Sequence, residues 1–72
     1  MSVNVKRDGR GIEILVKGAQ TQEDALAELF ERLLDEIRKL PGVVVWGWRI
    51  KPETDRKYNP DNWWAYARIE IQ

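Results

Sequence analysis

The chain has 72 residues, with twelve basic and twelve acidic side chains, so its formal net charge is zero. It contains no cysteine and no histidine, which excludes disulfides, zinc–thiolate sites and imidazole chemistry. Zero net charge gives no overall field toward nucleic acid or an anionic membrane, and no apolar run reaches the roughly 18 residues of a membrane span. We therefore expect one small cytoplasmic domain without a cofactor, signal peptide or membrane segment.

Residues 1–17 predict a β-hairpin. Residues 3–7 and 12–17 both alternate apolar and polar side chains, and the sequence Asp-Gly-Arg-Gly separates them. Asp-Gly in this position is typical of a tight hairpin turn in which a glycine supplies the positive φ. The first strand is short and polar, as suits a sheet edge. Leu15 is expected to point away from the core, and the side chains expected to face the core are Val3, Val5, Ile12, Ile14 and Val16.

Residues 21–40 predict a helix that Thr21 caps, with Asp24 at its third position. Acidic residues in its first turn and basic ones in its last match the helix dipole, and Pro41-Gly42 is expected to end it. The apolar stripe comprises Leu26, Leu29, Phe30, Leu33, Ile37 and Leu40. The opposite side offers pairs four residues apart that indicate a solvated face: Glu28–Arg32, Arg32–Glu36 and Asp35–Lys39.

Residues 43–71 predict two aromatic-rich strands, VVVWGWRI and WWAYARIEI, which hold all four tryptophans and are joined by the loop 51–62. Alternation assigns their side chains to two faces of a sheet. The set expected under the helix is Val43, Val45, Gly47, Trp63, Ala65, Ala67, Ile69 and Ile71. The aromatic set expected on the other face is Val44, Trp46, Trp48, Ile50, Trp64, Tyr66, Arg68 and Glu70. A parity shift at a bulge near Gly47 is the alternative, and it would make some of the tryptophans core residues.

The element order predicts an α+β fold, β-β-α-β-β, with a four-stranded, mainly antiparallel sheet and one helix packed on one face. We expect the strand order 1-2-4-3, with the helix crossing from the second strand to the third. A β-grasp order, 2-1-4-3, is the alternative, which the short polar first strand disfavours. The twelve-residue loop is long for a hairpin connection, and long loops are often functional. The alternatives are a mobile tip, or strands that extend into the loop.

The inventory of reactive groups predicts no catalysis. The hydroxyl groups have no imidazole or thiol to activate them. Carboxylate pairs occur in the helix, but on its predicted solvent face, and the loop acids Glu53, Asp55 and Asp61 do not match the spacing of a calcium loop. We expect neither an enzyme nor a metal site.

The aromatic set predicts an interaction surface, because soluble monomers rarely expose large apolar patches and Trp, Tyr and Arg dominate interface hot spots. The first expected partner is a second copy, in a homodimer or larger assembly, through this face or the edge of the third strand. Single-stranded nucleic acid is an alternative, since nine basic against six acidic residues lie outside 21–40. Cross-strand stabilisation of the hairpin is the structural alternative. The predicted surface comprises Val44, Trp46, Trp48, Ile50, Trp64, Tyr66 and Arg68.

From Ile12 onward, the layout strand–helix–strand–strand with Trp46 in VVVWGW resembles the dodecins, over about 60 residues. That resemblance implies a hollow dodecamer with a flavin stacked on Trp46. The strand at 3–7 and the Pro/Asn-rich loop depart from the dodecin layout. A designed origin is a further interpretation, because the capped helix, the Asp-Gly hairpin and the lack of Cys and His agree with idealised design practice.

Overall fold

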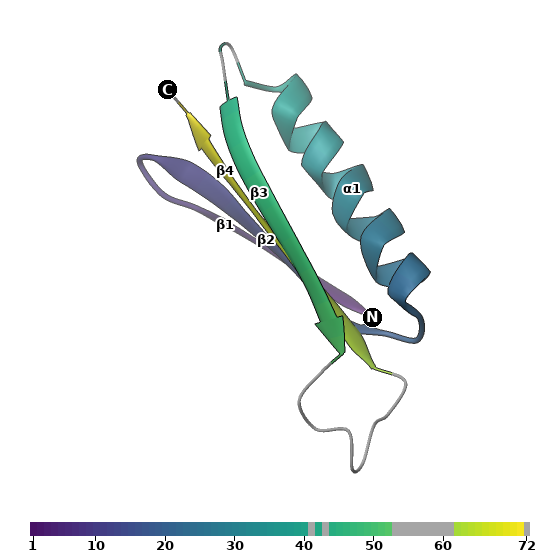
Figure 1. The fold of residues 1–72 in the computed structure, drawn as a ribbon. Helices are drawn as coiled ribbons and strands as arrows, with labels where there is room; N and C mark the ends of the chain where they lie inside the picture. Colours follow the sequence, from purple (N-terminus) through teal and green to yellow (C-terminus); the bar gives the residue numbers. More distant parts are fainter. Residues whose placement is uncertain (41, 43, 53–61, 72) are drawn as a thin grey trace.

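The structure is a computed structural model that describes residues 1–40, 42, 44–52 and 62–71, with only the backbone described at positions 44, 45, 51, 52 and 71. Its elements are β1 (Ser2–Arg7), β2 (Gly11–Ala19), α1 (Gln22–Arg38), β3 (Val44–Pro52) and β4 (Trp63–Ile71). The strands form one sheet in the order β1-β2-β4-β3, and every neighbouring pair is antiparallel. Helix α1 lies on one face of this sheet (Figure 1). The predicted α+β fold and strand order are confirmed.

The last two strands meet at the predicted loop. Strand β3 continues through Pro52, two residues beyond its predicted end, so the strands do extend into that loop. Residues 53–61 of the loop, and Val43 at the predicted start of the strand, lie outside the described residues.

The N-terminal hairpin turns at Asp8 rather than on a positive-φ glycine. The Asp8 carboxylate oxygen Oδ1 accepts hydrogen bonds from the backbone N–H groups of Arg10 and Gly11, each at 2.8 Å. The Asp8 N–H donates to the Gly11 carbonyl at 3.0 Å. Among the described residues, Gly18 alone has a positive φ. The expected positive-φ glycine in this turn is therefore wrong, because an Asx turn orients the backbone instead.

Helix α1 begins as predicted and ends earlier. Thr21 Oγ1 accepts a hydrogen bond from the Asp24 N–H at 3.1 Å, which confirms the N-cap. The helix stops at Arg38, two residues before the predicted end, and Pro41 lies outside the described residues. The N–H groups of Lys39 and Leu40 donate to carbonyls three residues back, at 3.2 and 3.1 Å. This tightened final turn satisfies carbonyls that would otherwise lack partners.

The core lies between α1 and the central strands β2 and β4. The predicted inward faces of both strands are confirmed except at Ile71, whose side chain lies outside the described ones, and Ala65 and Ala67 on β4 leave room for the helix to approach closely. Their small side chains explain why a single helix can cover two strands. The buried apolar residues are Ile12, Ile14, Val16, Ala19, Ala25, Leu29, Leu33, Ala65, Ala67 and Ile69.

Glu36 is a buried charge that the sequence assigned to the solvated face. It is 7% exposed, and its Oε1 lies 2.7 Å from Nη2 of Arg7 at the end of β1. Arg32 pairs with Glu28 at 3.3 Å instead. The predicted Arg32–Glu36 pair is wrong because Glu36 follows Leu29 by seven residues, which places it on the buried side of the helix. Its partner comes from a distant strand, which helical spacing does not reveal.

Candidate interaction surfaces

The register of β3 against β4 separates the tryptophans into two groups. Trp46 lies opposite Ile69, Trp48 opposite Ala67 and Ile50 opposite Ala65. Directly opposite residues in an antiparallel pair share a face, and these β4 residues are buried under α1. Trp46, Trp48 and Ile50 therefore lie on the helix side. Their predicted place beside Trp64 and Tyr66 is wrong.

Contacts with the helix establish the same placement. The Phe30 ring lies edge-to-face against both exposed tryptophans of β3, with ring centroids 6.5 Å from Trp46 and 5.4 Å from Trp48. Ile50 packs against the core. The side chain of Val44, which the prediction placed with them, lies outside the described side chains.

The alternation of side chains was predicted correctly within β3 and within β4. The error lies in which face of β3 was matched with which face of β4. Pairing is continuous from Val44 to Pro52, so no bulge interrupts it at Gly47. The pair Pro52–Trp63 leaves the ten residues 53–62 between the strands. With an even number of residues between the paired ends, even-numbered residues of β3 lie opposite odd-numbered residues of β4. The predicted faces placed even-numbered residues of both strands together, which requires an odd number of residues between them. The alternative of a bulge near Gly47 that makes tryptophans core residues is also wrong, because Trp46 and Trp48 lie on the helix side but are 43% and 46% exposed.

An exposed apolar patch follows the β3 side of the helix. Trp46, Trp48 and Leu34 are 43%, 46% and 51% exposed, although all three are large apolar side chains. Leu34 follows Phe30 by four residues and so lies on the same side of α1, towards β3. Helix α1 lies mainly over β2 and β4, which leaves the helix side of β3 partly uncovered. We call Phe30, Leu34, Trp46 and Trp48 the edge patch. Sequence reasoning missed Leu34 because it lies at the margin of the apolar stripe.

The same patch borders a sheet edge that no described strand pairs with. Strands β1 and β3 form the two edges of the sheet. Strand β1 has six residues and ends in two exposed cations, Lys6 and Arg7. Strand β3 has nine residues and carries the edge patch along its helix side. Short, charged edges resist pairing with other chains, whereas long apolar edges favour it.

The opposite face, which no element of the described chain covers, has a hollow of its own. It measures about 260 Å³ and is lined by Leu15, Lys17, Arg49, Trp64 and Tyr66, which we call the open-face hollow. The Arg49 guanidinium lies over the Tyr66 ring, 5.8 Å from its centroid. Burial, and then the nearby Glu13 carboxylate, raise the pKa of the Tyr66 phenol, so it stays protonated at neutral pH. The predicted placement of Trp64 and Tyr66 away from the helix is correct.

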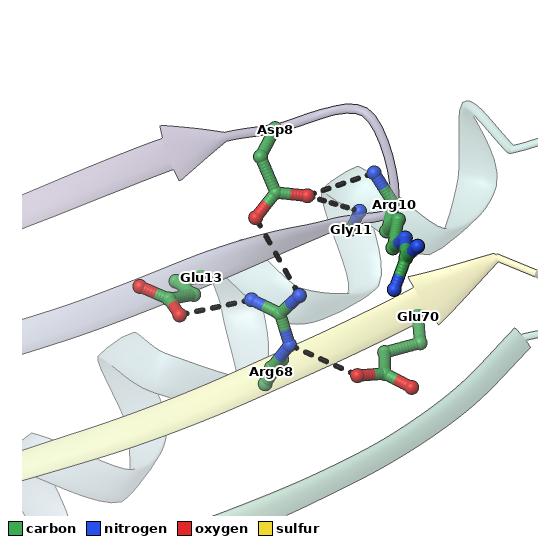
Figure 2. Close-up of polar contacts among 6 residues, drawn as sticks. All are labelled: Asp8, Arg10, Gly11, Glu13, Arg68 and Glu70. Carbon is green, nitrogen blue, oxygen red and sulfur yellow. Dashed lines mark hydrogen bonds and ion pairs between the residues drawn. The ribbon is translucent and has the colours of Figure 1, made fainter.

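Arg68 shares this face, where three carboxylates surround it (Figure 2). Its guanidinium lies 2.9 Å from Glu13, 3.1 Å from Glu70 and 3.5 Å from Asp8. The hydrogen bond to Glu70 is the main reason that the pKa of Arg68 is raised. The predicted interaction residue Arg68 therefore lies on the expected face, but its charge is balanced by carboxylates from β2, β4 and the hairpin turn.

Comparisons with known proteins give no relative: no family model matches the chain, and no curated protein or solved structure matches it. Flavin binding, implied by the resemblance to dodecins, stays a prediction. Within the described part of the chain, no group of three or more acidic residues is placed to hold a metal ion. No helix found there is long and apolar enough to span a membrane.

Proposed function

We propose that this chain is a self-association module in which a second copy adds to the edge of β3. The observation that supports it is the nine-residue edge of β3, which pairs with no other strand in the described part of the chain and is bordered by Trp46 and Trp48, each nearly half exposed. An apolar edge with open backbone groups is a template for another strand. A second copy offers the matching edge and the matching patch, as a two-fold interface requires.

The geometry of such a pair follows from strand symmetry. Two identical strands that pair antiparallel are related by a two-fold axis perpendicular to the sheet, and opposite residues share a face. Both helices then lie on one side of an eight-stranded sheet, with the two edge patches between them. A register centred on Gly47 sets Trp46 opposite the partner's Trp48. The same register keeps Arg49 away from the partner's Arg49, which avoids a pair of opposed like charges.

The exposed area sets the expected strength. With about 45% of roughly 250 Å² exposed on each ring, Trp46 and Trp48 offer about 220 Å² per copy. Leu34 and the β3 backbone add to this. Stable interfaces bury about 800 Å² per partner, so these side chains supply only part of such an interface. We expect a dimer whose population rises with protein concentration.

Face-to-face packing of the open sheet faces is less favourable. That face carries Lys17, Arg49 and Lys6, which a second copy would bring against the same cations. Like charges in a desolvated interface are destabilising. The sheet edge therefore provides the better self-complementary surface.

A single cysteine tests this arrangement, because the chain has none of its own. A Cβ at Gly47 would meet no atom within 4 Å, so Gly47→Cys should fold normally. Opposite Cβ atoms in an antiparallel pair lie about 4.5–5.5 Å apart, close enough for a disulfide with small adjustments. We expect rapid disulfide-linked dimers under mild oxidation, and much slower formation for the matched variant Asn4→Cys on the β1 edge. Equal rates for both variants would count against the β3 edge.

A further inference from the structure

We infer that the open-face hollow binds a nucleotide unit, from single-stranded nucleic acid or as the free nucleotide. The base stacks on Trp64, and Lys17 and Arg49 meet the phosphate. This inference does not depend on self-association, because the hollow lies on the sheet face opposite the edge patch. Its support is the arrangement of two cations around an aromatic central strand.

A β-bulge places Lys17 beside Trp64. Val16 pairs with Ala65 and Ala19 with Trp63, so Lys17 and Gly18 together oppose the single residue Trp64. Gly18 has φ 75°, a conformation that glycine adopts without the steric cost other residues meet. Bulges redirect side chains and often occur next to binding sites. Here the bulge brings a cation from β2 to the border of the aromatic surface.

The second cation comes from the other side of β4. Tyr66 lies opposite Leu15 on β2 and Arg49 on β3, so the three form a row across the sheet. Adjacent strands are about 4.8 Å apart, which sets the β2 and β3 backbones about 10 Å apart with the aromatic strand between them. A flat ring stacked on β4 would therefore have a cation within reach on either side.

The charges of this region are available to an anion. Among the residues that the structure describes, no carboxylate lies within ion-pair distance of Lys17 or Arg49. Glu13 lies near Tyr66, but its carboxylate is held by Arg68 at 2.9 Å. Lys6 lines an adjoining hollow that shares Leu15 and Tyr66. The surface thus has a cationic aromatic end and an ion-paired end.

The pairing of cations with aromatic rings favours one class of anion over others. A simple anion would use the cations alone, and an acidic peptide would leave the aromatic surface uncovered. A nucleotide uses both, because every base has a π-face that stacks on an aromatic side chain while its phosphate meets Lys or Arg. Stacking needs unpaired bases, so a duplex should bind less well than a single strand.

The test is fluorescence anisotropy of a labelled oligothymidylate titrated with the whole chain, over a series of salt concentrations. Contact of two cations with phosphates should give a log–log salt slope of about −1.4. Lys17→Gln, which removes one of these contacts, should make the slope shallower, at about −0.7. Trp64→Leu should weaken binding about 5- to 160-fold. The matched control is Trp48→Phe, which alters a ring on the other face and should leave binding unchanged.

Competition identifies the source of the nucleotide. If thymidine monophosphate displaces the labelled oligothymidylate, the hollow binds free nucleotides. If only unlabelled oligothymidylate displaces it, the hollow binds single strands. Either result supports the inference. Three outcomes overturn it: no saturable binding at low salt, equal binding of duplex and single strand, or full affinity in Trp64→Leu. Because Lys17 is exposed, Lys17→Gln keeps the test valid even if the Trp64 variant unfolds.

Discussion

Substitution of Arg7→Ala is expected to lower the free energy of unfolding by about 1–2 kcal/mol, because it leaves a buried carboxylate without its close partner. Arg7 Nη2 lies 2.7 Å from Glu36 Oε1, and the Glu36 side chain is only 9% exposed. Lys39, at 3.9 Å, would be the remaining cation. Breaking a fully buried pair costs about 3–5 kcal/mol. The Arg7 side chain is itself 58% exposed, so water screens the pair and reduces that figure.

Denaturant unfolding followed by tryptophan fluorescence, at one low protein concentration, measures this cost. For a domain of this size, a loss of about 1–2 kcal/mol corresponds to a fall in Tm of about 4–16 °C. The decisive comparison is the same substitution in a Glu36→Met background, where an apolar side chain replaces the charge. Glu36→Met alone should be neutral or stabilising. Arg7→Ala should then cost no more than about 0.5 kcal/mol. An equal cost in both backgrounds would refute the assignment of the energy to this ion pair.

Two further predictions concern the hairpin turn. Gly11→Ala should destabilise the fold by about 1–3 kcal/mol, because a Cβ there would collide with the Ile69 carbonyl oxygen. Gly9→Ala, where a Cβ meets nothing within 4 Å, should change stability by less than about 0.5 kcal/mol in the same denaturation assay. Backbone N–H groups of Arg10 and Gly11 lower the pKa of Asp8 below its ordinary 3.8. A lowered pKa stabilises the fold above the unfolded value and loses that effect as pH falls through the folded value, so the destabilisation by Asp8→Ala should shrink in acid. Equal destabilisation near pH 7 and near pH 2 would contradict it.

Local patterns were sufficient to predict the elements and their order. Alternation identified the inward residues of β1 and β2, and Thr21 and Asp24 marked the start of the helix. A short polar β1 and the two alanines of β4 led to the correct strand order. Each of these signals depends on neighbours in sequence, or on side-chain size at one position.

The surfaces were harder to predict because they depend on relations between distant segments. Alternation separates the two faces of β3 and the two faces of β4. Which face of β3 adjoins which face of β4 depends on the pairing register, and therefore on the number of residues between the paired ends. Matching the wrong faces placed Trp46, Trp48 and Trp64 together on one predicted aromatic face. The bulge that aligns Lys17 with Trp64 was also missed, because the second strand was expected to end at Lys17, with Gly18 in the connection to the helix. The structure shows two separate surfaces: an apolar one at the β3 edge and a cationic aromatic one on the open face.

The most direct test of self-association is the molar mass measured by light scattering across a wide range of protein concentration, for the wild type and for Leu34→Lys. Leu34 is 51% exposed, so this substitution places a charge in the edge patch while removing little internal packing. We expect the wild-type mass to rise from one chain toward two with concentration, and the variant to stay at one. A wild type that remains a monomer throughout, or a variant that associates equally well, would contradict association through the β3 edge.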